Sequence, residues 1–494
     1  MGLSNAWDVA TTSLATNAGL TSIVSRNISN AQNTAGYVST KVANLVTGSN
    51  GAATIASISD LANATLFNSM LSSTSANASA QALSTGVTQL QQTVSDATTT
   101  SDSSTAAQSP STLLQSLSTA LQTYSSSPGS ASAASAVLTA AQSLASGLNS
   151  ASATVASVRE TADQDMVNSV STVNSLLAQF QDVNNRIVKG TATGSDISNA
   201  LDQRNTILQS LSQQIGITTT TGSNGSMSIY TDSGATLFDV SPRSVTMTPT
   251  TTYTASTTGA AVYVDGVPVT GANAVMPIQS GALAGYANLR DNVAPQYQAQ
   301  LDSIAGGLVN AFAETNSSTG AQAPGLFTYA GATGVPGSSR VSGLAGEIEV
   351  SSAVDPSQGG SLGLIRDGGI NGLGYVQNST GASGYSAVIQ GDIAALSATT
   401  AFPSAGGLST STSLSDYAAN SASWLDGEYQ TASSQATYQS TLQTQASQAL
   451  SNAIGVNIDT QMSKMLDLEN SYQASAKLIS TINTMFGALL QAVA

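Results

Sequence analysis

Apolar residues recur at helical spacing at both ends of this chain. Near the N-terminus they follow alternating steps of four and three residues, and polar residues interrupt the pattern at Asn17 and Thr21. A similar pattern covers residues 457–491. Each run predicts a helix with one apolar stripe, whose partner is the other helix or the same helices of neighbouring copies. The predicted seam consists of Leu3, Trp7, Leu14, Val24 and Ile28, and of Ile458, Met462, Met465, Tyr472, Ile479 and Phe486.

Helical spacing continues through most of the middle of the chain. Residues 217–280 differ, because Thr, Val, Tyr and Ile alternate there between turn pairs such as Asn224-Gly225, a pattern typical of hairpins. We therefore predict a mainly α protein with smaller β domains. The predicted division is a terminal coiled-coil core domain (1–55 plus 455–494), a helical-bundle domain (56–216 plus 281–324 plus 411–454), a small β unit (217–280) and a Gly/Ser-rich outer region (325–410).

The composition narrows the possible partners. The 494 residues include 12 basic and 27 acidic ones, a net charge of −15 that argues against nucleic acid as a ligand. Only 8% of residues are charged, against about a quarter in ordinary soluble proteins. The surface is therefore expected to be neutral and polar, or to be covered by other copies. There is no cysteine, so packing alone must hold the fold, and no disulfide would hinder passage through a narrow export route.

Targeting signals give a second set of expectations. Residues 1–30 lack the basic, apolar and cleavage regions of a secretory signal. The chain also contains no run of 18 apolar residues, so no membrane span is predicted. Two alternatives follow: a cytoplasmic protein, or a protein exported by a route that reads no cleaved peptide.

Candidate catalytic chemistry is sparse. The chain has no histidine or cysteine, which excludes a Ser-His-Asp triad, imidazole zinc ligands and thiol nucleophiles. None of its lysines follows a glycine, so a phosphate-binding Gly-Lys-Ser/Thr loop is absent. Two carboxylate pairs remain for acid–base catalysis, Asp163 with Asp165 and Glu347 with Glu349. Residues two apart on a helix diverge, and solvent exposure explains the second pair. We predict no enzymatic activity, no cofactor and no metal.

The two chain ends resemble a known family. The run from Asn27 to Tyr37 reads Asn-Ile-Ser-Asn-Ala-Gln-Asn-Thr-Ala-Gly-Tyr. It resembles the signature of the axial proteins of the bacterial flagellum, which usually reads Asn-Ile-Ala-Asn-Ala-Asn-Thr-Pro-Gly-Tyr. The departures are Ser29, Ala35 and one extra residue. Gly-Val-Asn-Ile-Asp at 455–459 and Tyr-Gln-Ala-Ser-Ala-Lys at 472–477 are similar to the family's closing helix. The matching signature positions are Asn27, Asn30, Asn33, Thr34, Gly36 and Tyr37.

The middle of the chain narrows this resemblance. Leu-Asp-Gln-Arg-Asn at 201–205 and the segment 281–291 resemble the hook-associated proteins of the hook–filament junction. The resemblance implies that the terminal helices form a coiled-coil core lining a tubular assembly, with the helical domain outside it, the β material outermost, and 325–410 as a reduced outer domain. It implies an adaptor ring for filament assembly, built from copies of this chain and exported through the flagellar type III channel to the extracellular flagellum. The implied partners are the hook protein, a second junction protein, and an export chaperone at the C-terminal helical region.

Two alternatives remain at this point. The chain could be another flagellar axial protein, such as a hook protein or the second junction protein, although its helical middle argues against this. From a different class, it could be a secreted adhesin or enzyme. Under the flagellar interpretation, Trp7 and Tyr472 are large anchors for the buried seam. We expect the terminal helices to be disordered or marginally helical before docking, because alone they cannot bury their stripes.

Overall fold

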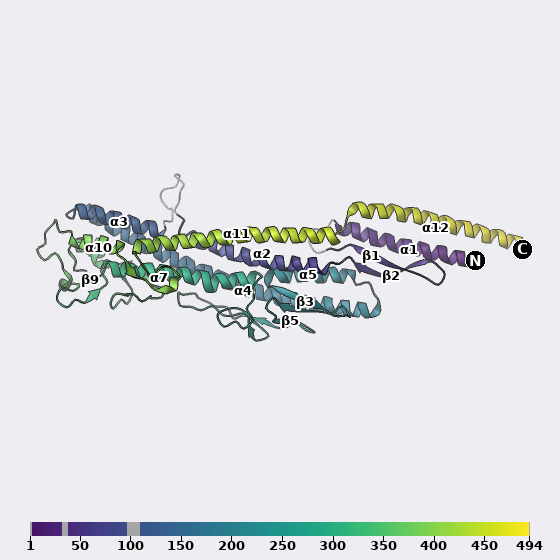
Figure 1. The fold of residues 1–494 in the computed structure, drawn as a ribbon, viewed down its shortest axis with the longest axis horizontal. Helices are drawn as coiled ribbons and strands as arrows, with labels where there is room; N and C mark the ends of the chain where they lie inside the picture. The colour runs from purple at the N-terminus through teal and green to yellow at the C-terminus, as the bar shows by residue number, and fades with distance from the viewer. Residues whose placement is uncertain (1, 32–37, 96–108, 494) are drawn as a thin grey trace.

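The computed structural model shows an elongated molecule with both ends of the chain at one tip (Figure 1). It describes residues 2–31, 38–95 and 109–493. At that tip the terminal helices α1 (Leu3–Ala31) and α12 (Ile458–Val493) lie side by side. A hairpin of β1 (Lys41–Thr47) and β2 (Ala53–Asp60) packs against α1. We call α1, β1, β2 and α12 the terminal unit.

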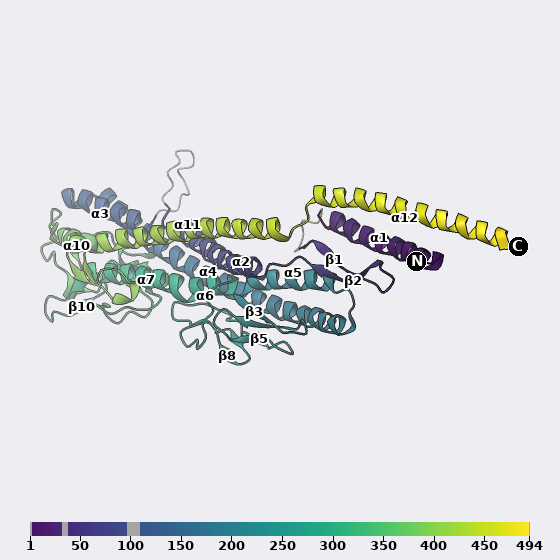
Figure 2. The same ribbon diagram turned by 45° about the vertical axis from the view of Figure 1, so that its right-hand side comes forward.

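The rest of the molecule is built on long helices that run along its length (Figure 2). The longest is α4, which starts after an N-cap at Ser130 and ends just before Gly194, a C-capping glycine in the left-handed conformation. We call this part the body. Its helices are α2 (Ala64–Gln91), α3 (Pro110–Ser126), α4 (Ala131–Thr193), α5 (Ser198–Gln214), α6 (Ala282–Asn288), the π-helix η1 (Leu289–Val293), α7 (Ala294–Ala311) and α11 (Leu414–Ile454).

Two three-stranded antiparallel sheets lie beside the α4–α5 end of the body. The first has the order β3 (Ile217–Thr221), β4 (Met227–Thr231), β5 (Thr236–Phe238). The second has the order β6 (Val245–Thr246), β7 (Tyr263–Val264), β8 (Val267–Pro268). The hairpin expected around Asn224-Gly225 is present, since β3 pairs with β4 and Gly225 has φ +80°.

Residues 314–412 form many short elements at the end of the molecule far from the chain termini (Figure 1). Their buried side chains join the core of the body; examples are Leu344, Phe327 and Ile389. The strands are β9 (Glu314–Thr315), β10 (Gln322–Ala323), β11 (Phe327–Tyr329), β12 (Ile348–Val350), β13 (Thr400–Ala401) and β14 (Ser411–Thr412). The helices are α8 (Leu344–Glu347), α9 (Leu364–Asp367) and α10 (Ala387–Ser397), with 3₁₀ turns η2 (Ser352–Val354), η3 (Pro356–Gln358), η4 (Leu373–Tyr375) and η5 (Ser404–Gly406).

Two hydrophobic cores lie one after the other along α4. The first contains the α4 side chains from Ala134 to Ala162, packed by α3, α7 and α11. The second contains those from Met166 to Ile187, packed by α2, α5 and both three-stranded sheets. One continuous helix therefore supports both cores. The predicted fold class, mainly α with smaller β parts and paired terminal helices, is confirmed.

A close helix contact inside the body gives the first testable expectation. Gly285 of α6 approaches α2 so closely that an added Cβ would lie 2.3 Å from the Ser79 carbonyl oxygen. Gly285→Ala is expected to lower the free energy of unfolding by roughly 1–3 kcal/mol, because backbone must move to relieve the overlap. Thermal unfolding followed by circular dichroism measures this.

The matched control is Gly427→Ala on α11. That position is exposed and has no atom near the added Cβ. Alanine there should raise the free energy of unfolding by about 0.5–1 kcal/mol through helix propensity. Equal effects of the two substitutions would contradict the packing argument for Gly285.

Candidate assembly surface

The two terminal helices are antiparallel and meet through small polar side chains. Asn17 Nδ2 donates to Ser471 Oγ at 2.8 Å, and the hydroxyls of Ser13 and Ser475 are 3.3 Å apart. As the residue numbers rise along α1, those of the bonded partners on α12 fall, so the two helices run antiparallel. Such short side chains let the helix backbones lie close, but they bury little apolar area. The pairing of α1 with α12 therefore leaves much of the apolar surface of α12 uncovered.

Asn27, a signature residue, ties three elements of the terminal unit together. Its Oδ1 accepts the backbone N–H of Lys41 at 2.9 Å, and its Nδ2 donates to the Lys41 carbonyl at 2.9 Å. Nδ2 also donates to Gln461 Oε1 on α12, at 3.1 Å. Asn27 is buried, so these bonds satisfy an amide that water cannot reach. A side-chain amide thus forms both hydrogen bonds of a strand neighbour to β1, which explains why asparagine stands here.

The other signature residues are placed less fully. Asn30 is half-buried on the last turn of α1. Asn33, Thr34, Gly36 and Tyr37 lie outside the described residues.

The predicted seam residues of α1 point mainly toward neighbours within the chain, whereas those of α12 do not. Val24 is buried, and Leu3, Trp7, Leu14 and Ile28 are half-buried. Of the predicted seam residues on α12, only Met465 and Ile479 are half-buried. Ile458, Met462, Tyr472 and Phe486 have exposed fractions of 43, 49, 48 and 36%. The cause is that α12 carries apolar residues on several sides. Met465, Leu468, Ile479 and Ile482 share the side of Gln461 and Ser475, which bond to α1, whereas Ile458, Met462 and Leu466 are turned away from that side.

Five further exposed apolar side chains belong to the surface but were not predicted. They are Leu466, Leu478, Met485, Leu489 and Leu490. A search for a single stripe misses Leu466, Leu478, Met485 and Leu489 because they lie beside that stripe, whereas Leu490, four residues after Phe486, continues it. Runs such as Met465-Leu466 and Met485-Phe486, where apolar residues are adjacent, were the available signal. We call the nine exposed residues, which lie on several sides of the helix, the α12 stripe: Ile458, Met462, Leu466, Tyr472, Leu478, Met485, Phe486, Leu489 and Leu490.

The β1–β2 hairpin adds a second exposed apolar area to the same tip. Val42, Leu45 and Val46 are all exposed. Within the described residues, β1 and β2 pair only with each other, and α1 covers one face of the hairpin. The terminal unit therefore presents apolar side chains both on α12 and on the hairpin, with α1 between them (Figure 1).

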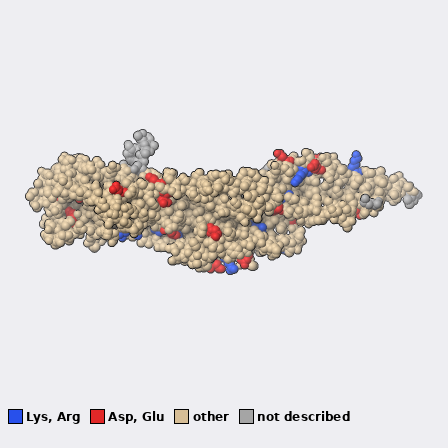
Figure 3. Space-filling view, in the orientation of Figure 1, with Lys and Arg blue, Asp and Glu red and all other residues tan. Residues whose placement is uncertain are grey.

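Charged groups are rare on the surface. Figure 3 shows scattered Lys, Arg, Asp and Glu side chains on a face that is otherwise uncharged. In residues 2–31, 38–95 and 109–493 no helix is long and apolar enough to cross a bilayer. Contacts at the α12 stripe would therefore depend on apolar burial and neutral hydrogen bonds more than on ion pairs.

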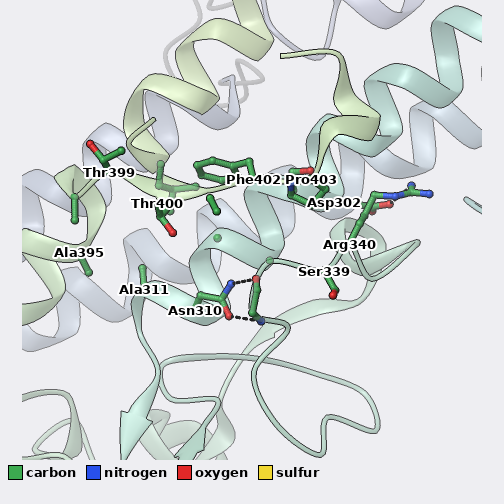
Figure 4. A pocket seen from close by; sticks show the side chains of 17 residues that line it. Asp302, Asn310, Ala311, Ser339, Arg340, Ala395, Thr399, Thr400, Phe402 and Pro403 are labelled. Atoms are coloured by element: carbon green, nitrogen blue, oxygen red, sulfur yellow. Dashed lines mark hydrogen bonds and ion pairs between the residues drawn. The ribbon is translucent and has the colours of Figure 1, made fainter. Parts of the chain in front are cut away.

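A pocket in the body is a weaker candidate for a site. It lies between α7, the loop around Gly337 and the segment leading into β13 (Figure 4), and its volume is about 240 Å³. Asn310 in its wall donates to the Gly337 carbonyl at 2.6 Å and accepts the Gly337 N–H at 2.9 Å. Asp302 accepts backbone N–H groups and pairs with Arg340 at 3.3 Å. The polar groups are thus already bonded within the chain, and the volume is below the usual range for ligand pockets.

The two carboxylate pairs do not form acid–base sites. Asp163 is buried and bonded to Arg290, Tyr253 and the Thr250 N–H, whereas Asp165 lies on another side of α4. Glu347 and Glu349 are both exposed, at the end of α8 and on β12. Neither pair lines a cleft that holds two carboxylates.

Two family models match this chain. Residues 446–492 match the C-terminal domain of flagellar basal body rod FlgEFG proteins, the region of α12 and the end of α11. Residues 99–325 match the helical domain of flagellar hook-associated protein FlgK, which covers α3 to α7 of the body and its three-stranded sheets. The terminal unit and the helical body together define an axial protein of the bacterial flagellum.

Within that class, the match of residues 99–325 supports assignment to the flagellar hook-associated protein FlgK family. The resemblance found in the residues is thereby confirmed. Proteins of this family are structural components of the flagellum.

One solved structure is similar in part, that of the flagellar hook junction protein FlgK from Burkholderia pseudomallei. The similarity covers 53% of this chain and 46% of that chain, with 22% sequence identity and a TM-score of 0.41. This chain therefore aligns with about half the length of that protein. No curated protein sequence matches this chain.

Proposed function

We propose that this protein is exported and forms an adaptor ring at the hook–filament junction, on which the filament assembles. The observation that carries the proposal is the exposed α12 stripe on a chain whose body is of the FlgK type. Large apolar side chains left exposed along one helix cost free energy in water and mark a surface made for a partner. In this proposal the partners that cover the stripe are the terminal units of neighbouring copies.

The shape of the molecule supports this arrangement. Both terminal helices lie at one tip and the short outer elements at the other (Figure 1). Copies that meet through their terminal units would place α1 and α12 at the centre of a tube and the body outside. The contact would be head-to-tail rather than self-complementary, since α12 of one copy faces a different surface of the next. Repeated contacts of that kind close into rings or continue as helices.

The stripe also needs protection before assembly. We propose that an export chaperone covers α12 until the subunit leaves the cell, by binding the helix in an apolar groove. The terminal helices would then order when they exchange the chaperone for neighbouring copies, the hook protein and the second junction protein. Deleting residues 1–35 should abolish incorporation into the ring, because α12 would lose α1; intact incorporation would refute this coupling.

A role in the rod or hook is the second candidate. The match of residues 446–492 favours it, because that domain is named for basal body rod proteins. The helical body favours the junction instead, since residues 99–325 match the FlgK domain.

Deletion of the gene separates these roles. Electron microscopy of the cells and blotting of the medium for flagellin give the readout. The junction role predicts hooks without filaments and flagellin lost to the medium. Cells without hooks would instead indicate that the protein belongs to the rod or the hook. Normal filaments would refute the flagellar role.

A further inference from the structure

The terminal unit and the body meet at a joint where charged residues gather. The chain crosses this joint at residues 61–63 and 455–457, and α12 is visibly offset from the end of α11 (Figure 2). Thr40 bonds the end of α11, its N–H to the Ile454 carbonyl and its hydroxyl to the Gly455 carbonyl, each at 2.9 Å. These bonds fix one point of the joint. They leave open how the terminal unit is held against rotation about that point.

Lys41 supplies a second point of attachment. Its side chain is fully buried, and Nζ lies 2.8 Å from Asp60 Oδ1 and 2.5 Å from Asp202 Oδ2. Asp60 belongs to β2 of the terminal unit, whereas Asp202 belongs to α5 of the body. Nζ also donates to the Ser198 carbonyl at 3.2 Å, and Ser39 Oγ donates to Asp202 at 3.0 Å. A buried ammonium cannot leave these partners without losing its compensation, so it holds the two parts in one orientation.

The charges in this joint do not balance. Around Lys41 stand two carboxylates, and a third, Asp196, is paired at 3.0 Å with Arg26 of α1. With Asp60 and Asp202 both ionised, the buried group carries one excess negative charge. Burial raises the pKa of Asp60 to about 6, although Lys41 opposes the shift. Asp202 and Asp196 add to the increase by charge repulsion. The cluster therefore favours a proton on Asp60.

We propose that Lys41, Asp60 and Asp202 form an ionic lock that sets the angle between the terminal unit and the body, and that ionisation of Asp60 loosens it. The closed lock consists of neutral Asp60 and the Lys41–Asp202 pair. When Asp60 loses its proton, two carboxylates compete for one ammonium across the joint. The terminal unit then turns more freely about the Thr40 contacts. This inference concerns the subunit itself and does not depend on the junction role.

The direction of the pH dependence follows from the raised pKa. In the open state Asp60 reaches water and titrates near its ordinary value of 3.8. The closed state holds the proton on Asp60 more tightly than the open state. The resulting stabilisation of the closed state is complete below pH 3.8 and is lost as the pH rises through about 6. Between pH 5 and pH 8 the ratio of closed to open molecules should fall roughly 10-fold.

Distance measurements between two spin labels test the lock on the full-length monomer. The chain has no cysteine, so Asn185→Cys on α4 and Ser480→Cys on α12, both exposed, receive the only labels. We expect one narrow distance distribution at pH 5 and a larger second population at pH 8. Lys41→Met should show the second population at both pH values. Asp60→Asn should stay narrow at both.

Arg26→Gln is the matched control. It removes the neighbouring ion pair, whose side chains are about one-third exposed. Surface pairs contribute little, so the ratio of populations should change less than twofold. Asp60→Asn keeps the test valid if Lys41→Met unfolds the terminal unit, which circular dichroism would reveal. A wild-type distribution that is the same at pH 5 and pH 8, or that Asp60→Asn does not narrow at pH 8, overturns the proposal.

Discussion

Replacing Met462, Leu466 and Tyr472 together by glutamine should leave a folded, secreted subunit that no longer supports filaments. All three side chains belong to the α12 stripe and are about half exposed in the single chain. Burying the remainder contributes roughly 2–4 kcal/mol per contact between copies, equivalent to about 30- to 1000-fold in association constant. Because a ring repeats the contact, the loss should prevent assembly. Electron microscopy should show hooks that end bare.

The matched control removes exposed apolar side chains elsewhere. Val240 and Leu373 are 82 and 93% exposed and lie far from the terminal unit in the sequence. Their double substitution by glutamine should leave swimming and filament number unchanged. Blotting the medium for the triple variant verifies that it is still exported. Normal filaments on cells that carry only the triple variant would show that the α12 stripe is not the assembly contact.

Arg290→Met should be the most destabilising single change in the body. The Arg290 side chain is fully buried on the π-helix η1. Its guanidinium contacts Asp163 at 2.6 Å, Asp291 at 2.8 Å and the Ala260 carbonyl at 2.9 Å. Removing it leaves two carboxylates without their cation, one of them deeply buried. The free energy of unfolding should fall by about 3–5 kcal/mol, measured by chemical denaturation.

Two further variants test the cause of that loss. Arg243→Met breaks an exposed pair with Asp265, at 3.5 Å, and should cost less than about 1 kcal/mol. Adding Asp163→Asn to Arg290→Met should recover part of the lost stability, because the amide carries no charge. If the double variant is as unstable as the sum of the two single changes, charge compensation is not the reason for the effect.

The location of Arg290 explains why this position matters. Asp163, its partner on α4, stands between Ala162 of the first core and Met166 of the second. Arg159, one turn earlier, donates to the carbonyls of Arg290, Thr254 and Thr257. A polar layer thus separates the two apolar cores. It connects the irregular segment near Thr254 to α4.

Local patterns predicted much of this fold. Repeats of three and four residues indicated the terminal helices and most of the body, and alternation around Asn224-Gly225 indicated the β3–β4 hairpin. These features depend on residues close in the sequence, where spacing alone carries the information.

Long-range placement was not predictable in the same way. Lys41 and Asp202 are 161 residues apart, and Arg290 and Asp163 are 127 apart, so no local pattern connects them. The orientation of α12 was also not determined by its pattern, because apolar residues occupy several of its sides. Small polar residues such as Ser471 and Ser475 decide which face meets α1. The assembly role of the seam residues stays a prediction.

The unbroken α4 turns the body into a lever. Its 63 residues correspond to a length of about 95 Å. The two cores are joined by this continuous helix rather than by a flexible connection. A tilt of roughly 10° at one end would displace the other end by roughly 16 Å at that length. A change in the protonation of Asp60 beside Lys41 that tilts the body by this angle would therefore displace its far tip by more than the diameter of a helix, about 10–12 Å.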